Sequence, residues 1–119
     1  RTRAGEHALD MLVLATGYDA ITGALTRLNP VGRGGVALKD AWAQRFGTYL
    51  GMAIPGFPNL FMIHGPESPS VLFNMPLGAE LQAEWIRDCA AWMRARGIGA
   101  IEPAPGTDRA WGEEVAAVA

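Results

Sequence analysis

The sequence predicts an α/β protein with an incomplete sheet. Two short apolar runs, residues 9–17 and 60–63, have the length of buried strands, and turn-forming glycines and prolines lie beside them. After Leu77, apolar side chains recur every three to four residues, which is the spacing of one helix face. Apolar strands joined to amphipathic helices by short loops are typical of α/β domains.

The composition is that of one globular domain or a part of one. Of the 119 residues, 50% are hydrophobic, which is enough for a core. The net charge of −2 provides no basic surface for nucleic acid. No apolar run approaches the roughly 18 residues of a membrane span. The single Cys89 excludes an internal disulfide and fits a reducing compartment, so we expect a cytoplasmic protein.

The chain starts without methionine, in the polar run of residues 1–7, and this start is not a secretory signal. We expect a piece cut from a longer protein. Its only histidines are His7 and His64, and with one cysteine they are too few for a zinc site, so we predict no bound metal.

The first predicted strand spans residues 9–17. Residues 11–15 are continuously apolar, as in a strand that is covered on both faces of a sheet. The strand ends in Ala15, Thr16 and Gly17, whose small side chains let a ligand or another backbone approach closely. Because ligands of open α/β sheets lie beyond the carboxyl ends of strands, this end is a candidate ligand-facing segment.

Glycines and prolines divide the middle of the chain. The glycine cluster of residues 32–35 predicts a turn, because it lacks the spacing of a phosphate-binding loop and no strand leads into it. Further along we expect a short strand, a helical turn, an extended segment and a turn, at residues 36–38, 40–42, 48–51 and 54–56.

The segment from residue 57 to residue 92 organises the chain, since it combines a strand, a loop rich in glycine and proline, and the long helix. Asn74 is a suitable N-cap, and Met75 and Pro76 occupy the first turn, where proline is tolerated. The free N–H groups of this turn carry partial positive charge and bind anionic or electron-rich groups. The alternative, which the pattern alone favours, is an ordinary strand–loop–helix unit without a ligand.

The predicted helix ends at Gly97, a residue suited to the left-handed conformation that follows a helix. After a short apolar run and a proline-rich loop, Thr107 or Asp108 can cap a last helix that reaches Val118.

Few side chains are suited to catalysis. His64 follows the second predicted strand, where it either faces a ligand or packs as an ordinary histidine, which is the more common case. Ser68 and Ser70 stand in no Gly-x-Ser-x-Gly elbow. Asp19 and Glu67 are carboxylates without a partner that spacing can establish. The residues therefore indicate two candidate ligand-facing loops and name no reaction.

Taken together, these segments resemble the C-terminal part of the flavin-dependent Baeyer–Villiger monooxygenases, in the phenylacetone and cyclohexanone monooxygenase group. Ala-Thr-Gly alone recurs in many flavoproteins. Its combination with Tyr-Leu-Gly, Gly-Phe-Pro-Asn-Leu-Phe and Gly-Pro-x-Ser-Pro-Ser, in this order, is much more specific. The resemblance extends from about Leu9 to Trp111 and is carried by residues 10–20, 38–42, 48–51, 56–61 and 65–75.

The resemblance implies that residues 1–119 are the C-terminal portion of a Rossmann-like FAD-binding domain. In that family, FAD and NADPH occupy two Rossmann-like domains, and one atom of dioxygen is inserted beside a ketone carbonyl to give an ester or lactone. The strand of residues 9–17 would return from the NADPH domain, and the segment of residues 57–92 would lie at the flavin. The resemblance assigns cofactor binding to Ala15, Thr16, Gly17, Asn74 and Met75. It assigns substrate binding to Pro69, Ser70, Val71, Leu72 and Phe73.

Several parts that the family uses do not occur in these residues. There is no strict Gly-x-Gly-x-x-Gly turn and no Phe-x-Gly-x-x-x-His-x-x-x-Trp fingerprint, and the family's arginine beside the flavin lies upstream. We therefore expect no catalytic residue here and an inactive isolated piece, whose partner is the missing N-terminal part of the same enzyme. Two alternatives remain open: a related flavin monooxygenase that oxidises amine nitrogen or sulfide sulfur, and a non-catalytic interaction module derived from such an enzyme.

Overall fold

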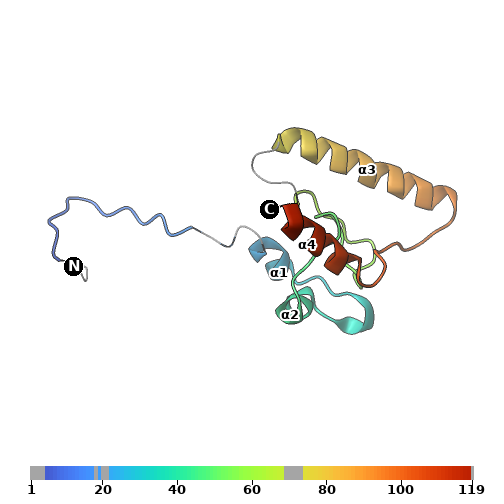
Figure 1. Ribbon diagram of the computed structural model, residues 1–119, viewed down its shortest axis with the longest axis horizontal. Helices are drawn as coiled ribbons and strands as arrows, with labels where there is room; N and C mark the ends of the chain where they lie inside the picture. Colours follow the sequence, from blue (N-terminus) through green and yellow to red (C-terminus); the bar gives the residue numbers. More distant parts are fainter. Residues whose placement is uncertain (1–4, 18, 20–21, 69–73, 119) are drawn as a thin grey trace.

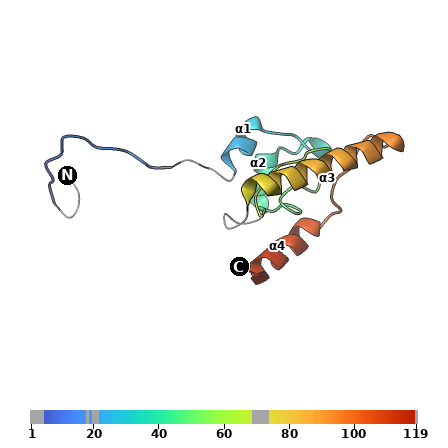
Figure 2. The ribbon, with the colours of Figure 1, turned by 90° about the horizontal axis from the view of Figure 1, so that it is seen from above.

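In the computed structural model, helices and irregular loops form a body, and an extended arm leads away from it (Figure 1 and Figure 2). The structure describes residues 5–17, 19, 22–68 and 74–118. Their helical elements are, in chain order, α1 (Gly23–Leu28), the 3-10 turn η1 (Arg33–Gly35), α2 (Leu38–Gln44), α3 (Met75–Ala95) and α4 (Thr107–Val118). The long helix α3 lies along one side of the loops that connect the shorter helices (Figure 1).

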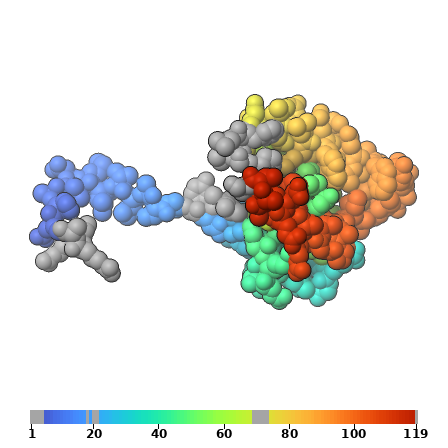
Figure 3. Space-filling view, viewed as in Figure 1, coloured from blue at the N-terminus to red at the C-terminus, as the bar shows by residue number. Residues whose placement is uncertain are grey.

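The arm consists of residues 5–17 and projects from the body (Figure 3). Its side chains are exposed, and Leu12 and Leu14 keep 71% and 76% of their surface accessible. The strand predicted for residues 9–17 is not formed here. The reason is physical: a strand needs a neighbour to pair its N–H and C=O groups, and the described part of the chain places no strand beside these residues.

The core lies between α2 and the loop that follows it. Leu38 is fully buried at the start of α2, and Trp42, one turn later, is only 9% exposed. These two side chains pack with three apolar residues of the loop, Ile54, Phe57 and Met62, and with Leu25, Ala41 and Leu60 at the edge. The helical turn predicted at residues 40–42 is thus confirmed, and it holds the centre of the core.

The predicted incomplete sheet is not confirmed. The described residues form no strand longer than a single bridge, and such bridges join Val31 to Ala37 and Tyr49 to Ala53. Residues 60–63, predicted as a strand, have no strand conformation, although Met62 N–H donates to Met52 C=O at 2.8 Å. Gly65 N–H donates to Gly51 C=O at 3.0 Å. The segments of residues 51–52 and 62–65 are therefore joined by separate backbone hydrogen bonds and not by the regular ladder of a sheet.

The glycine cluster forms the predicted turn. Gly34 has a φ of 67°, a left-handed conformation that glycine adopts easily. Gly32 N–H donates to Val36 C=O at 2.8 Å and closes the turn. A side chain on Gly32 would lie 2.3 Å from Gly56 O, so the close approach of two backbones requires glycine there. The short strand predicted at residues 36–38 is not formed, because Leu38 already begins α2.

The long helix agrees with the prediction. α3 spans Met75–Ala95, and Gly97, with a φ of 65°, follows its C-cap. Ile98 N–H donates to Met93 C=O at 2.9 Å and Gly97 N–H to Arg94 C=O at 3.3 Å, which is the bonding of a Schellman motif. The apolar face of α3 is only partly covered, because Trp85 and Trp92 are 49% and 44% exposed. These two tryptophans therefore do not belong to the core.

The last helix, α4, spans Thr107–Val118, which confirms the predicted helix and its end at Val118. Thr107 and Asp108 lie within its first turn, so neither is the cap that was predicted. No helix among the described residues is long and apolar enough to cross a membrane. In the same part of the chain, no group of three or more His, Cys, Asp or Glu side chains is placed to hold a metal ion.

Candidate functional site

The first turn of α3 is the ligand-facing site that the sequence predicts. Asn74 is its N-cap, as predicted: its Oδ1 accepts the N–H of Leu77 at 3.2 Å, and its C=O accepts the N–H of Gly78 at 3.0 Å. Pro76 has no N–H. Within the described part of the chain, the N–H of Met75 is therefore the donor that this turn leaves for a ligand, at the positive end of the helix.

His64 ties the preceding loop to this turn. Its Nε2 lies 2.7 Å from Met75 O, and its backbone N–H donates to Oε1 of Gln82 at 2.8 Å. Gln82 in turn donates to Oγ of Ser68 at 3.3 Å. The first two turns of α3 are thus held to both ends of the loop of residues 64–68.

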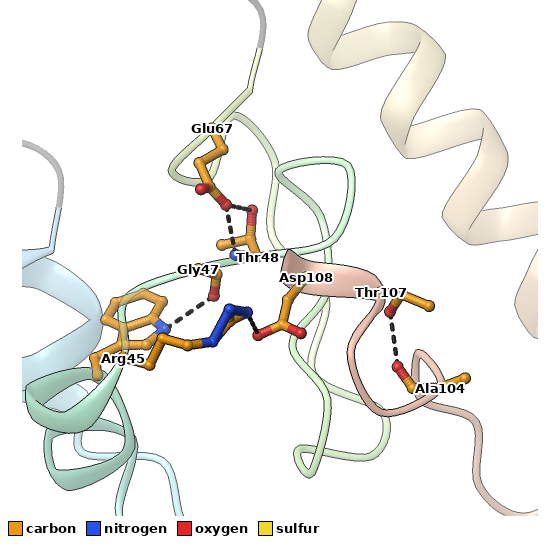
Figure 4. A network of polar contacts seen from close by, with 8 residues as sticks. Arg45, Gly47, Thr48, Glu67, Ala104, Thr107 and Asp108 are labelled. Carbon is orange, nitrogen blue, oxygen red and sulfur yellow. Dashed lines mark hydrogen bonds and ion pairs between the residues drawn. The ribbon is translucent and has the colours of Figure 1, made fainter. Parts of the chain in front are cut away.

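A second polar network, which includes Thr48 and Glu67, also holds this loop (Figure 4). Thr48 is fully buried, and its N–H and hydroxyl donate to Oε2 of Glu67 at 2.6 and 3.2 Å. The hydroxyl also lies 2.7 Å from the C=O of Pro66, its other acceptor. Trp111 donates its indole N–H to the C=O of Glu67 at 3.1 Å, which joins α4 to the loop.

The polar contacts of Figure 4 continue below Glu67. Trp42 donates its indole N–H to Gly47 C=O at 3.1 Å, and Arg45 forms an ion pair with Asp108 in the first turn of α4. The core helix α2 and the last helix α4 are therefore both connected to the segment that carries Thr48.

A small apolar cavity of about 160 Å³ lies between α3 and the loops. Phe61 and Trp85 meet across it with ring centroids 6.2 Å apart and nearly perpendicular planes, a favourable edge-to-face contact. Its remaining walls are mainly apolar: Tyr49, Ala53, Leu60, Ile101 and Pro103, with the carboxylate of Glu102. That carboxylate is occupied by Arg33 and by the N–H of Gly56, so the cavity offers no free charge to a ligand.

The structure does not bring the predicted cofactor residues together. Ala15, Thr16 and Gly17 lie in the exposed arm, on the side of α1, whereas Asn74 and Met75 lie at the start of α3 (Figure 1 and Figure 2). The predicted substrate residues, Pro69, Ser70, Val71, Leu72 and Phe73, lie outside the described residues.

Two carboxylates, Glu67 and Asp19, have partners that were not predicted from the sequence. Glu67 binds Thr48, which precedes it by 19 residues, and no local spacing signals such a pair. Asp19 binds the N–H of Thr22 at 2.9 Å, directly before α1, and this contact was detectable because aspartate commonly precedes helices in this way.

The chain is similar to known monooxygenases over nearly all of its length. It is 39% identical over 115 residues to 2-oxo-Δ3-4,5,5-trimethylcyclopentenylacetyl-CoA monooxygenase of Pseudomonas putida, covering 97% of this chain and 21% of that protein. It is 42% identical over 106 residues to a Baeyer–Villiger monooxygenase of Pseudooceanicola batsensis, covering 89% and 19%. It is 39% identical over 106 residues to phenazine N-monooxygenase PhzNO1 of Lysobacter antibioticus, also covering 89% and 19%. The chain thus spans about a fifth of these relatives, and no protein-family model matches it.

The chain is also similar to solved structures of monooxygenases. The chain superimposes on cyclohexanone monooxygenase in its open form with a TM-score of 0.86 at 38% identity, covering 98% of this chain and 22% of that one. It superimposes on OTEMO in complex with FAD and NADP with a TM-score of 0.86 at 39% identity, covering 99% and 22%. The arm is included in both superpositions, because the uncovered 1–2% is far smaller than residues 5–17.

Proposed function

Because this chain is homologous over nearly its full length to a segment of the Baeyer–Villiger monooxygenases, we propose that residues 1–119 are the C-terminal portion of the FAD domain of such an enzyme. The whole protein is then an FAD- and NADPH-dependent monooxygenase, located in the cytoplasm, that inserts one atom of dioxygen beside a ketone carbonyl to give an ester or lactone. The observation that carries this proposal is the superposition of the chain, arm included, on OTEMO with FAD and NADP.

The arm supports the proposal because its apolar side chains need a cover. Met11 is 78% exposed and Val13 is 76% exposed, and neighbouring residues of the arm are similarly open. A continuously apolar extended segment suits a sheet that is covered on both faces. We assign that sheet to the N-terminal part of the same enzyme, since the relatives are about five times as long as this chain.

The first turn of α3 is the proposed site of the flavin ring. Reduced FAD supplies the activation of dioxygen when it is bound. The N–H of Met75 and the positive end of α3 are preorganised to stabilise negative charge nearby, and Asn74 keeps that turn in place through its bond to Leu77. Ala15, Thr16 and Gly17 provide a second cofactor-facing segment, whose small side chains permit close approach once the arm has its partner strands.

The substrate pocket is proposed to include Pro69, Ser70, Val71, Leu72 and Phe73. The residues that flank them in sequence support this position. Ser68 is bonded to Gln82 in the second turn of α3, and Asn74 caps the first turn, so both flanks lie beside the proposed flavin site.

Oxidation of nitrogen is the second candidate function. The observation in its favour is the 39% identity to a phenazine N-monooxygenase over 106 residues, which is close to the identity with a Baeyer–Villiger enzyme. Both reactions would use the same flavin site, and the residues of this chain do not distinguish a ketone from an amine.

The experiment is to express the complete reading frame that contains these residues and to supply FAD. We expect a yellow protein whose oxidation of NADPH accelerates with a cyclic ketone, and an ester or lactone that carries one oxygen atom from labelled dioxygen. An N-oxide from a phenazine or amine, with no ester, would establish the second candidate. A reading frame that opens near residue 1, with a product that retains no flavin, would refute both and favour the interaction module.

A further inference from the structure

His64 combines two unfavourable features at one position. Its backbone φ is 52°, a left-handed conformation that a residue with a side chain rarely adopts. Its Nδ1 is buried and has no hydrogen-bond partner in the described chain. Strained backbone and unsatisfied buried atoms persist where the surrounding contacts demand them, and they concentrate at functional sites.

His64 forms hydrogen bonds to two residues of α3, Met75 and Gln82. A carbonyl oxygen only accepts, so the 2.7 Å contact with Met75 O requires a proton on Nε2, and Nδ1 is the ring atom left without a partner among the described residues. The left-handed backbone directs the N–H of His64 to Gln82 Oε1. One residue therefore bonds both the first and the second turn of the helix.

Among the described residues, α3 has few other polar contacts near its N-terminus, where Gly78 is its buried residue. Gln82 also donates to Ser68, and Phe61 contacts Trp85 one turn further on, but Met75 and Leu77 are 38% and 46% exposed. Among the described residues, the side-chain hydrogen bonds that hold these two turns to the loop of residues 64–68 come from the ring of His64 and from the side chain of Gln82.

We propose that His64 is a positioning residue: its Nε2–H bond to Met75 C=O fixes the first turn of α3, and thereby fixes the Met75 N–H relative to the flavin ring. This inference rests on the proposed function for the identity of the ligand. It does not depend on that function for the effect on the helix.

The test compares His64→Leu with His64→Gln in the complete protein. Both replacements face the same left-handed backbone and have similar volume, but only the glutamine amide can place a donor near Met75 C=O. Hydrogen–deuterium exchange by mass spectrometry, without added flavin, measures the helix directly. We expect His64→Leu to raise exchange in the first two turns of α3 by about tenfold, the factor for one lost hydrogen bond, and His64→Gln to restore protection. Exchange in the last two turns of α3 is the internal control.

The second readout is the flavin. We expect His64→Leu to weaken FAD retention by up to about tenfold and to change the visible circular dichroism of the bound flavin, with recovery in His64→Gln. Unchanged exchange in His64→Leu, or equal exchange in the two variants, would overturn the positioning role. Altered exchange with unaltered flavin signals would overturn the link to the cofactor. A wild-type protein that binds no FAD would refute the proposed function, and the exchange data would still decide whether His64 positions the helix.

Discussion

The carboxylate of Glu67 accepts a hydrogen bond from the backbone N–H of Thr48 at 2.6 Å, and at 3.2 Å it shares the single hydroxyl proton of Thr48 with Pro66 C=O, which lies at 2.7 Å. Glu67 makes these contacts from a backbone with a φ of 61°, where a side chain is disfavoured. Thr48 is fully buried, so its N–H has no access to water. The strained backbone of Glu67 thus places its carboxylate where it accepts the buried N–H of Thr48. This contact fixes the loop that leads to the proposed substrate residues.

Replacement of Glu67 separates these two contributions. Glu67→Ala removes the acceptor and keeps the strained backbone, and we expect it to lower the free energy of unfolding by about 2 kcal/mol. Glu67→Gly also removes the acceptor but relieves the left-handed strain, so it should lose about 1 kcal/mol less than alanine. Urea denaturation of the two variants measures the difference.

Glu67→Gln is the control for charge. Its amide oxygen can accept from Thr48 N–H at the same place, so we expect a loss of about 1 kcal/mol, from the weaker neutral hydrogen bond alone. If alanine and glutamine cost the same, the contact with Thr48 contributes nothing to stability.

Gly32 should be far less tolerant of substitution than Gly34. A Cβ on Gly32 would lie 2.3 Å from Gly56 O and 2.9 Å from the ring of Phe57, so Gly32→Ala must displace backbone, and we expect a loss of about 3 kcal/mol. A Cβ on Gly34 would contact no other atom, so Gly34→Ala should lower the free energy of unfolding only through the strain of its positive φ, by about 1 kcal/mol. Equal urea midpoints for the two variants would contradict this account of the turn.

The core prediction concerns Leu38, which is fully buried at the start of α2 against Ile54, Phe57 and Met62. Leu38→Ala should reduce the free energy of unfolding by about 2–5 kcal/mol, because it removes buried methyl groups and leaves a cavity. Leu28→Ala is the matched control, since Leu28 is 78% exposed and should change stability by less than about 0.5 kcal/mol. Thermal unfolding followed by circular dichroism distinguishes the two.

The sequence was sufficient to predict α3 because every determinant of that helix is local. The apolar spacing, the Asn74 cap and Gly97 after the last turn all lie within the segment itself, and the structure contains each of them. The same holds for α4 and for the glycine turn of residues 32–35.

The strand predictions failed because an apolar run indicates burial without specifying the partner. Residues 9–17 have the pattern of a covered strand, yet no strand of the described chain lies beside them, and their side chains remain open. Trp85 shows the same effect, because it lies on an apolar helix face that the rest of the described residues covers only in part. The Glu67–Thr48 pair was invisible because it depends on a tertiary contact and on a backbone conformation that glutamate does not favour.

Asn74 should affect stability and the flavin in opposite ways, which makes it the sharpest test of the proposed site. Asn74→Ala loses the hydrogen bond to Leu77 N–H, so we expect about 1 kcal/mol lower stability and a smaller change in the midpoint potential of bound flavin than a charged replacement causes.

Asn74→Asp keeps an acceptor for Leu77 and adds a negative charge at the positive end of α3, which should stabilise the helix by about 0.5 kcal/mol. The same charge beside the ring opposes the gain of electrons, so we expect a more negative midpoint potential and weaker binding of reduced FAD. Spectroelectrochemical titration of the complete protein measures the potential, and thermal unfolding of the flavin-free form measures the helix. If aspartate raises stability while the potential stays at the wild-type value, the first turn of α3 forms as described but does not face the flavin.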